Sequence, residues 1–156
     1  MDWSEIARWA VPSLIVVLGW SVVSRGNDRR ETRKEVRQFL DRTIASVENI
    51  RKNVIDCLTK EVCDDSKKLE LSIDPELLRL EAALEILKLK VNDHKLDGKT
   101  LRTAVYNNGH YRVLKREKMD MDHRVLQEIN VAAADLCSSL EQAYRETYQK
   151  SKFWQV

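Results

Sequence analysis

The stretch from Asn27 to about Val62 contains neither glycine nor proline, the two residues that most often break a helix. Apolar and small residues recur through it at alternating spacings of four and three, as they do along a coiled-coil seam or one face of an amphipathic helix. The seam consists of Val36, Leu40, Thr43, Val47, Ile50, Val54 and Cys57. Such a helix can pack within its own domain or pair with copies of itself, and the sequence leaves both arrangements open.

The scarcity of breakers predicts an all-α fold for residues 26–156. Only four glycines and two prolines occur in 156 residues, and most other positions carry good helix formers. The second predicted helix has Asp74 as its N-cap and Pro75 at its first position, and it ends near Asn92. The other predicted segments are a polar connector over 63–72 with a short extended piece, a short helix over 99–106, and a last helix from near Tyr111 or somewhat later to about Lys152. The prediction is therefore a helical bundle of two long and two shorter helices.

The second predicted helix is apolar on two faces, which is typical of a helix at the centre of its bundle. One face carries Leu77, Leu80, Leu84, Leu87 and Val91, and the other carries Leu78, Ala82, Ile86 and Leu89.

Residues 9–24 carry no charge, and with Ile6 and Ala7 the apolar stretch covers about 28 Å as a helix, close to the ~30 Å hydrocarbon core of a bilayer. We therefore predict a transmembrane anchor within residues 1–25. A cleaved signal peptide and a buried core helix are the alternatives. Asp2 and Glu5 precede the stretch and a basic cluster follows it, which is the order of a stop-transfer segment. The positive-inside rule then places the N-terminus outside and the C-terminal domain in the cytoplasm.

Tryptophan and basic side chains flank this segment, where they suit the two membrane interfaces. The predicted membrane-interface residues are Trp3, Arg8, Trp9, Trp20, Arg25, Arg29, Arg30, Arg33, Lys34 and Arg37.

The formal net charge of +2 lacks the basic excess expected of a protein that binds nucleic acid through phosphate contacts. The three cysteines, Cys57, Cys63 and Cys137, are odd in number and lack zinc-site spacing. No phosphate-binding glycine loop or nucleophile elbow occurs either. We predict no metal and no cofactor.

Two patterns of residues suggest functional sites. Arg116 and His123, with six residues between them, fit the spacing found in the HEPN ribonucleases, which are helical bundles, although Glu117 stands where that family often has a polar residue such as Asn. The alternative reading is two helix-surface residues. A phosphate or nucleotide could bind at a corner formed by aromatic and basic side chains, and surface packing is the alternative there. The candidate ligand-binding residues are Tyr106, Tyr111, Arg112 and Lys115.

The sequence LGWSVVS followed by NDRRETRKEVRQFLDRTI resembles small single-pass inner-membrane proteins of bacteria that are found among mobile-element and phage-defence genes. This resemblance covers the N-terminal third, and it implies a bacterial inner-membrane location and a role as an accessory or effector of defence. Taken with the bundle, we predict a membrane-tethered, non-enzymatic interaction or signalling module, with the lipid bilayer and a protein partner or further copies of itself as partners. The alternatives are a membrane-anchored HEPN-like ribonuclease and a nucleotide-gated effector that disrupts the membrane.

Overall fold

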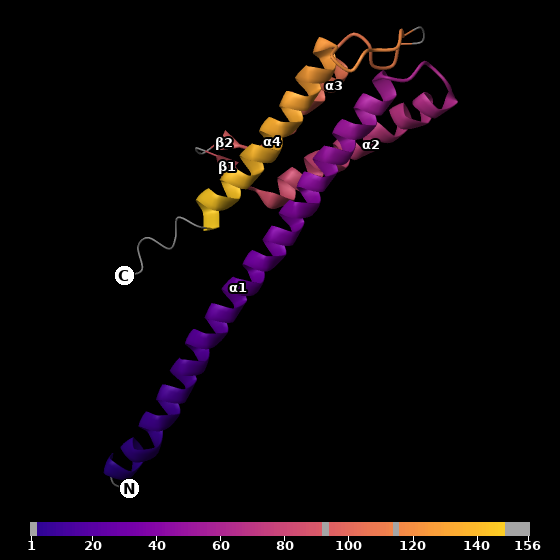
Figure 1. The fold of residues 1–156 in the computed structure, drawn as a ribbon. Helices are drawn as coiled ribbons and strands as arrows, with labels where there is room; N and C mark the ends of the chain where they lie inside the picture. Colours follow the sequence, from indigo (N-terminus) through magenta and orange to yellow (C-terminus); the bar gives the residue numbers. More distant parts are fainter. Residues whose placement is uncertain (1–2, 92–93, 114–115, 149–156) are drawn as a thin grey trace. The chain divides into compact units, whose positions relative to one another are not determined.

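The computed structural model describes residues 3–91, 94–113 and 116–148, which form four α-helices and one small hairpin (Figure 1). The predicted all-α class is confirmed. The helices are α1 (Trp3–Leu58), α2 (Asp64–Leu87), α3 (Lys99–Tyr106) and α4 (Arg124–Tyr148), and strand β1 (Lys90–Val91) pairs antiparallel with β2 (His94–Lys95). The chain divides into two units, residues 1–37 and 38–156.

The first unit consists, in its described residues, of the helical turns of α1 up to Arg37. The hydroxyl of Thr32 donates a hydrogen bond of 2.8 Å to the carbonyl of Asp28 one turn earlier. Trp20 and Val23 are 75% and 60% exposed.

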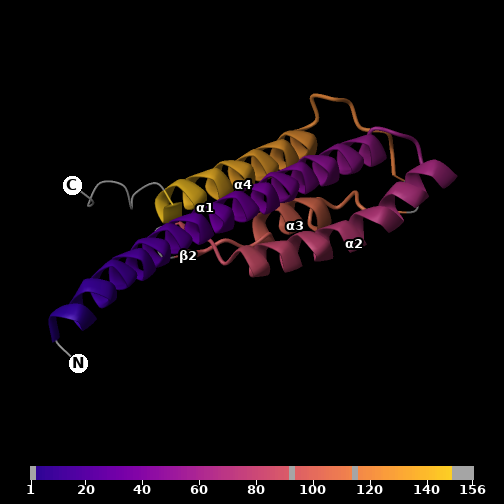
Figure 2. The same ribbon diagram turned by 90° about the horizontal axis from the view of Figure 1, so that it is seen from below.

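The second unit is a bundle in which the later part of α1 lies between α2 and α4 (Figures 1 and 2). The short helix α3 and strand β1 both pack against α4. Residues from all four helices form one continuous apolar core. Its largest fully buried side chains are Leu40, Ile50, Leu58, Ile73, Leu77, Leu80, Leu101, Leu126, Ile129, Leu140, Val47 and Val54.

The seam of α1 packs within its own domain, which settles the choice that the sequence left open. Leu40, Val47, Ile50 and Val54 have no solvent exposure, and Thr43 is 3% exposed while its hydroxyl donates back to the carbonyl of Phe39. A seam buried in this way is not available for pairing with another copy of the chain.

The N-cap of helix α2 lies eleven residues before the predicted one, so the polar connector and the extended piece predicted over 63–72 are wrong. Cys63 caps the helix, and its backbone N–H donates to the side-chain oxygen of Ser66 at 3.0 Å. Asp64 and Asp65 in the first turn face the positive end of the helix dipole. This start, without Ser, Thr, Asp or Asn at the cap, is stabilised by Ser66, which points back into the turn.

Pro75 consequently lies inside α2 and not at its first position. A proline there has no N–H to donate and disturbs the carbonyls of the preceding turn. The hydroxyl of Tyr111 donates to the carbonyl of Glu70 in the turn before, at 2.9 Å. The helix also ends at Leu87, before the predicted Asn92, because Lys88 adopts a left-handed conformation with φ 49° and the hairpin follows.

The second apolar face of α2 is exposed, so the predicted central position of this helix is wrong. Leu71, Leu78 and Ile86 are 69%, 57% and 67% exposed, whereas Leu77, Leu80 and Leu84 are buried. One face of α2 packs on the bundle and the other faces solvent.

The described residues of segment 107–123 form a loop, and the last helix begins only at Arg124. With 24 residues in α2 and 25 in α4, only α3, with 8, is short among the described helices, so the predicted division into two long and two shorter helices is also wrong. The short helix predicted over 99–106 is confirmed.

Candidate functional site

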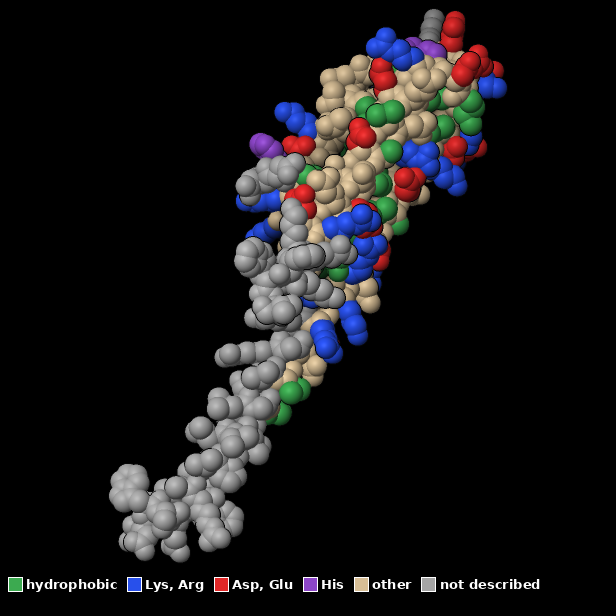
Figure 3. Space-filling model, turned by 60° about the vertical axis from the view of Figure 1, so that its left-hand side comes forward, with side chains coloured by type: hydrophobic (Ala, Val, Ile, Leu, Met, Phe, Trp, Pro, Cys, Tyr) green, Lys and Arg blue, Asp and Glu red, His purple; other side chains and the backbone are tan. Residues whose placement is uncertain are grey.

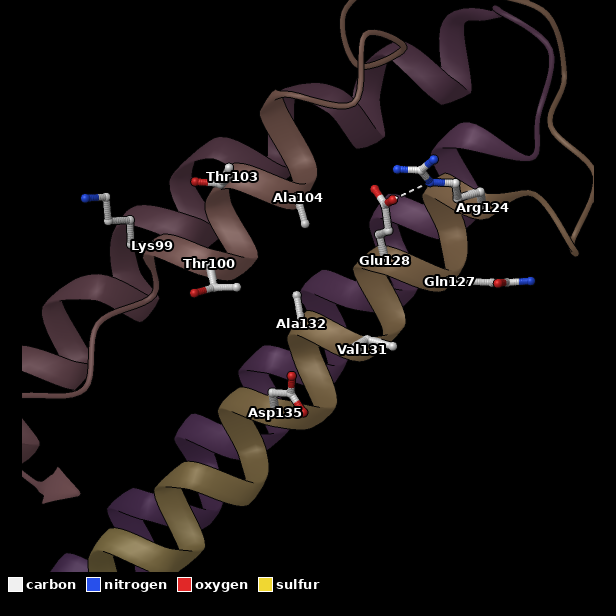
Figure 4. Close-up of a pocket in the computed structure, with 10 residues that line it drawn as sticks. All are labelled: Lys99, Thr100, Thr103, Ala104, Arg124, Gln127, Glu128, Val131, Ala132 and Asp135. Carbon is white, nitrogen blue, oxygen red and sulfur yellow. Dashed lines mark hydrogen bonds and ion pairs between the residues drawn. The ribbon is translucent and has the colours of Figure 1, made fainter. Parts of the chain in front are cut away.

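An open groove of about 680 Å³ runs between α3 and α4 (Figure 4). Its wall on α3 is formed by Lys99, Thr100, Thr103 and Ala104, and its wall on α4 by Arg124, Gln127, Glu128, Val131, Ala132 and Asp135. The two walls arise because α3 has only two buried residues, Leu101 and Val105, and turns its threonines toward solvent. Short side chains on α3 therefore leave the neighbouring surface of α4 uncovered.

The floor of this groove is apolar and its edges are polar. Ala132 is 6% exposed, and Val131 is 59% exposed, which is a high value for a β-branched apolar side chain. At one end Arg124 donates to Glu128 at 2.7 Å, and this exposed ion pair raises the pKa of Arg124. An apolar floor with convergent polar groups at the edges is the usual composition of a binding site.

The predicted ligand-binding residues come together in the structure, but around a carboxylate. Tyr106 and Tyr111 donate to Asp74 at 2.7 and 3.0 Å, and Arg112 forms an ion pair with the same carboxylate. Lys115 lies outside the described residues. The carboxylate of Asp74 occupies the position that an anionic ligand would need. These contacts therefore hold α3 and the loop that follows it against α2.

Burial and the hydrogen bond to Asp74 raise the pKa of both tyrosines, with burial as the larger cause. The two rings meet edge to face with centroids 5.4 Å apart. Both hydroxyls therefore stay protonated and act as hydrogen-bond donors.

Arg116 is a buried structural residue, and its side chain has no solvent exposure. It donates to Glu70 of α2 and to the backbone carbonyl of Cys57 in the last turn of α1, each at 2.7 Å. Its Nε is the one buried side-chain nitrogen or oxygen in the described part of the chain without a hydrogen-bond partner. A cation at this helix end compensates the unpaired carbonyls and the negative end of the dipole.

His123 is exposed and its Nδ1 accepts a hydrogen bond from the backbone N–H of Val125 at 3.2 Å, so it caps α4. Its ring lies against that of His110, with centroids 5.7 Å apart. Arg116 is held inside the bundle and His123 outside, so the structure does not unite them in a site open to a phosphodiester.

Charged side chains of both signs are interspersed over the face of the bundle in Figure 3. Within the described residues no three His, Cys, Asp or Glu side chains form a group that could hold a metal ion.

The predicted membrane-interface residues fall in the first unit and only some have described side chains. Trp20, Arg30 and Lys34 are exposed, and Arg33 and Arg37 are half-buried. The side chains of Trp3, Arg8, Trp9, Arg25 and Arg29 lie outside the described residues. Among the residues that the structure describes, no helix combines the length and apolar character needed to cross a membrane.

No protein-family model matches this chain, and no match was found among curated proteins or solved structures. The described residues thus form an all-α bundle with an open groove between α3 and α4.

Sequence reasoning missed the α3–α4 groove, although a signal for it is present. Thr100, Thr103 and Ala104 place three short side chains on one side of a two-turn helix, next to Val131 and Ala132 of α4. Their proximity depends on tertiary packing that no local pattern encodes.

Proposed function

We propose that this chain is a non-enzymatic interaction module, tethered to the bacterial inner membrane by residues 1–25, whose cytoplasmic bundle binds a helix of a partner protein in the α3–α4 groove. The groove itself is the observation that carries this proposal. Val131, which lines the groove, is 59% exposed. Exposing a side chain of this kind forgoes the free energy that its burial would contribute.

The dimensions of the groove favour a helix as its occupant. From Arg124 to Asp135 it covers about 17 Å of α4, or roughly three helical turns. Lys99 and Asp135 offer charges of both signs at its edges, which suits the polar sides of an amphipathic helix.

The tether and the orientation rest on the sequence: the uncharged stretch and the basic cluster that follows it. The role as an accessory or effector of phage defence rests on the resemblance of the first 50 residues. An enzymatic role is less well supported, because Arg116 is committed to Glu70 and Cys57.

The groove can be tested by photo-crosslinking in cells. A benzophenone amino acid at Val131 should give one discrete protein adduct in membranes, and the same probe at Ala45, an exposed position on α1, should not. Thr100→Trp would fill the groove from an exposed position and should abolish the adduct, whereas Thr147→Trp, exposed near the end of α4, should leave it. Equal labelling at Val131 and Ala45 would contradict the proposal.

The tether can be tested independently with fusions at the C-terminus. A fluorescent protein that folds only in the cytoplasm should be bright and should resist alkaline extraction from membranes, and a periplasmic phosphatase fused at the same position should be inactive. An active phosphatase would contradict the proposed orientation. Full extraction of the chain from membranes at alkaline pH would contradict the proposed membrane tether.

A further inference from the structure

The exposed face of α2 carries a continuous apolar stripe, which we call the α2 stripe. It consists of Leu71, Pro75, Leu78, Ala82 and Ile86, all of them exposed. Its three largest side chains, Leu71, Leu78 and Ile86, are 57–69% exposed, although the same helix buries Leu77, Leu80 and Leu84 on its other face. An amphipathic helix that only covered its own bundle would not need this second stripe.

The spacing of the stripe matches the core of an antiparallel helix pair. Leu71, Pro75, Leu78 and Ala82 follow one another at intervals of four, three and four, as core positions do in a two-helix seam. If two copies of α2 pack antiparallel about a two-fold axis between Glu76 and Leu77, Leu71 of one copy lies opposite Ala82 of the other, and Leu78 lies opposite Pro75. Each layer then combines a large side chain with a smaller one, which allows the two surfaces to interdigitate.

The charges beside the stripe match in the same register. Lys68 lies opposite Glu85 of the second copy, and Asp65 lies opposite Lys88, so the layers on either side of the apolar centre pair opposite signs. All four side chains belong to exposed residues. Lys68 and Glu85 already form solvent-exposed ion pairs within the chain, with Asp65 and Lys95, and such pairs can be shared or exchanged at little cost.

We propose that the α2 stripe is a homodimerisation surface, at which two copies of the chain pair antiparallel with Leu71 against Ala82 and Lys68 against Glu85. The observation that selects a second copy over another partner is this self-complementarity, which a two-fold interface requires. The stripe extends over about 22 Å of helix and has few large side chains, so the interface is smaller than the ~800 Å² per partner of standard complexes. We expect a dissociation constant in the micromolar range.

A disulfide test reads the register directly. Leu71 and Ala82 lie about 16 Å apart within one helix, far beyond the ~4.4–6.8 Å between Cα atoms that a disulfide spans. In a background that carries Cys63→Ser and Cys137→Ser, the double variant L71C/A82C of the purified full-length chain in detergent should oxidise to a covalent dimer. The single variants L71C and A82C should stay monomeric on gels run without reducing agent. In this register each introduced cysteine lies far from the same cysteine of the second copy. Dimers of the single variants, or none of the double variant, would overturn the proposal.

Charge reversal supplies a second test at two exposed positions, Lys68 and Glu85. K68E and E85K should each weaken the dimer about tenfold in sedimentation equilibrium, because each places like charges opposite one another twice per dimer. The combination K68E/E85K should restore the wild-type dissociation constant. R145E, an equivalent reversal at an exposed position on α4 outside the groove, should leave dimerisation unchanged. A wild-type chain that stays monomeric up to its solubility limit, or a double reversal weaker than either single one, would overturn the proposal.

Discussion

The buried ion pair between Arg116 and Glu70 should be one of the largest single contributions to the stability of the bundle. The Arg116 side chain has no solvent exposure and Glu70 has 17%, and the two atoms Nη1 and Oε1 are 2.7 Å apart. Glu70→Ala would leave a buried guanidinium with the Cys57 carbonyl as its remaining strong acceptor. Breaking a buried pair from one side costs about 3–5 kcal/mol, and the partial exposure of Glu70 places this case near 3 kcal/mol.

We expect the Glu70→Ala variant to unfold about 10 °C below the wild type, as the scaling for a domain of this size implies. Near-ultraviolet circular dichroism of Tyr106 and Tyr111 in the full chain is the readout, because both rings lie in the bundle. Glu128→Ala removes the partner of the exposed Arg124 and serves as the matched control, with a cost of about 0.5 kcal/mol or less. A loss below about 1 kcal/mol for Glu70→Ala would refute the structural role of the pair.

Three further outcomes follow from the loop and the cysteines. Because the pKa of Tyr111 is raised, its contribution to stability is fully present below the unfolded pKa of about 10 and is lost as pH rises. Tyr111→Phe should therefore cost about 1–2 kcal/mol at neutral pH and reduce the loss of stability at alkaline pH, and an unchanged alkaline loss would contradict this. Backbone hydrogen bonds at the start of α2 lower the pKa of the Cys63 thiol, while burial raises the pKa values of Cys57 and Cys137. Iodoacetamide should therefore alkylate Cys63 first, as measured by mass spectrometry, and earlier labelling of Cys57 would contradict this order. Gly109 has a φ of +74°, whereas Gly98 does not have a positive φ. Gly109→Ala should therefore lower the free energy of unfolding by about 1 kcal/mol, and Gly98→Ala should not. Equal effects of the two substitutions in chemical denaturation would show that backbone strain is not the cause.

The periodicity of apolar residues correctly predicted the helices that bury one face only. The seam from Leu40 to Cys57 is buried, and α3 occupies the predicted residues, since the breakers at Gly98 and Asn107 bound it. The pattern failed where a local signal competed with a longer-range one. The Asp74–Pro75 pair looks like a helix start, but the helix is already established at Cys63 and continues through the proline.

The candidate sites were harder to predict because their chemistry depends on partners distant in sequence. The loop arginines Arg112 and Arg116 look available for phosphate in the sequence, yet Asp74 and Glu70 of α2 neutralise them. The two apolar faces of α2 were visible, but nothing local distinguishes a face that packs from one left exposed. The groove depends on how two helices separated by a loop are placed side by side.

The most direct test of a covered groove is the alkylation rate of Val131→Cys in membranes from cells that make the chain at its natural level, compared with the same variant purified in detergent. We expect strong protection in membranes, lost on purification, with no such difference for Thr147→Cys. Equal rates for Val131→Cys in the two preparations would contradict the proposal that a partner helix occupies the α3–α4 groove.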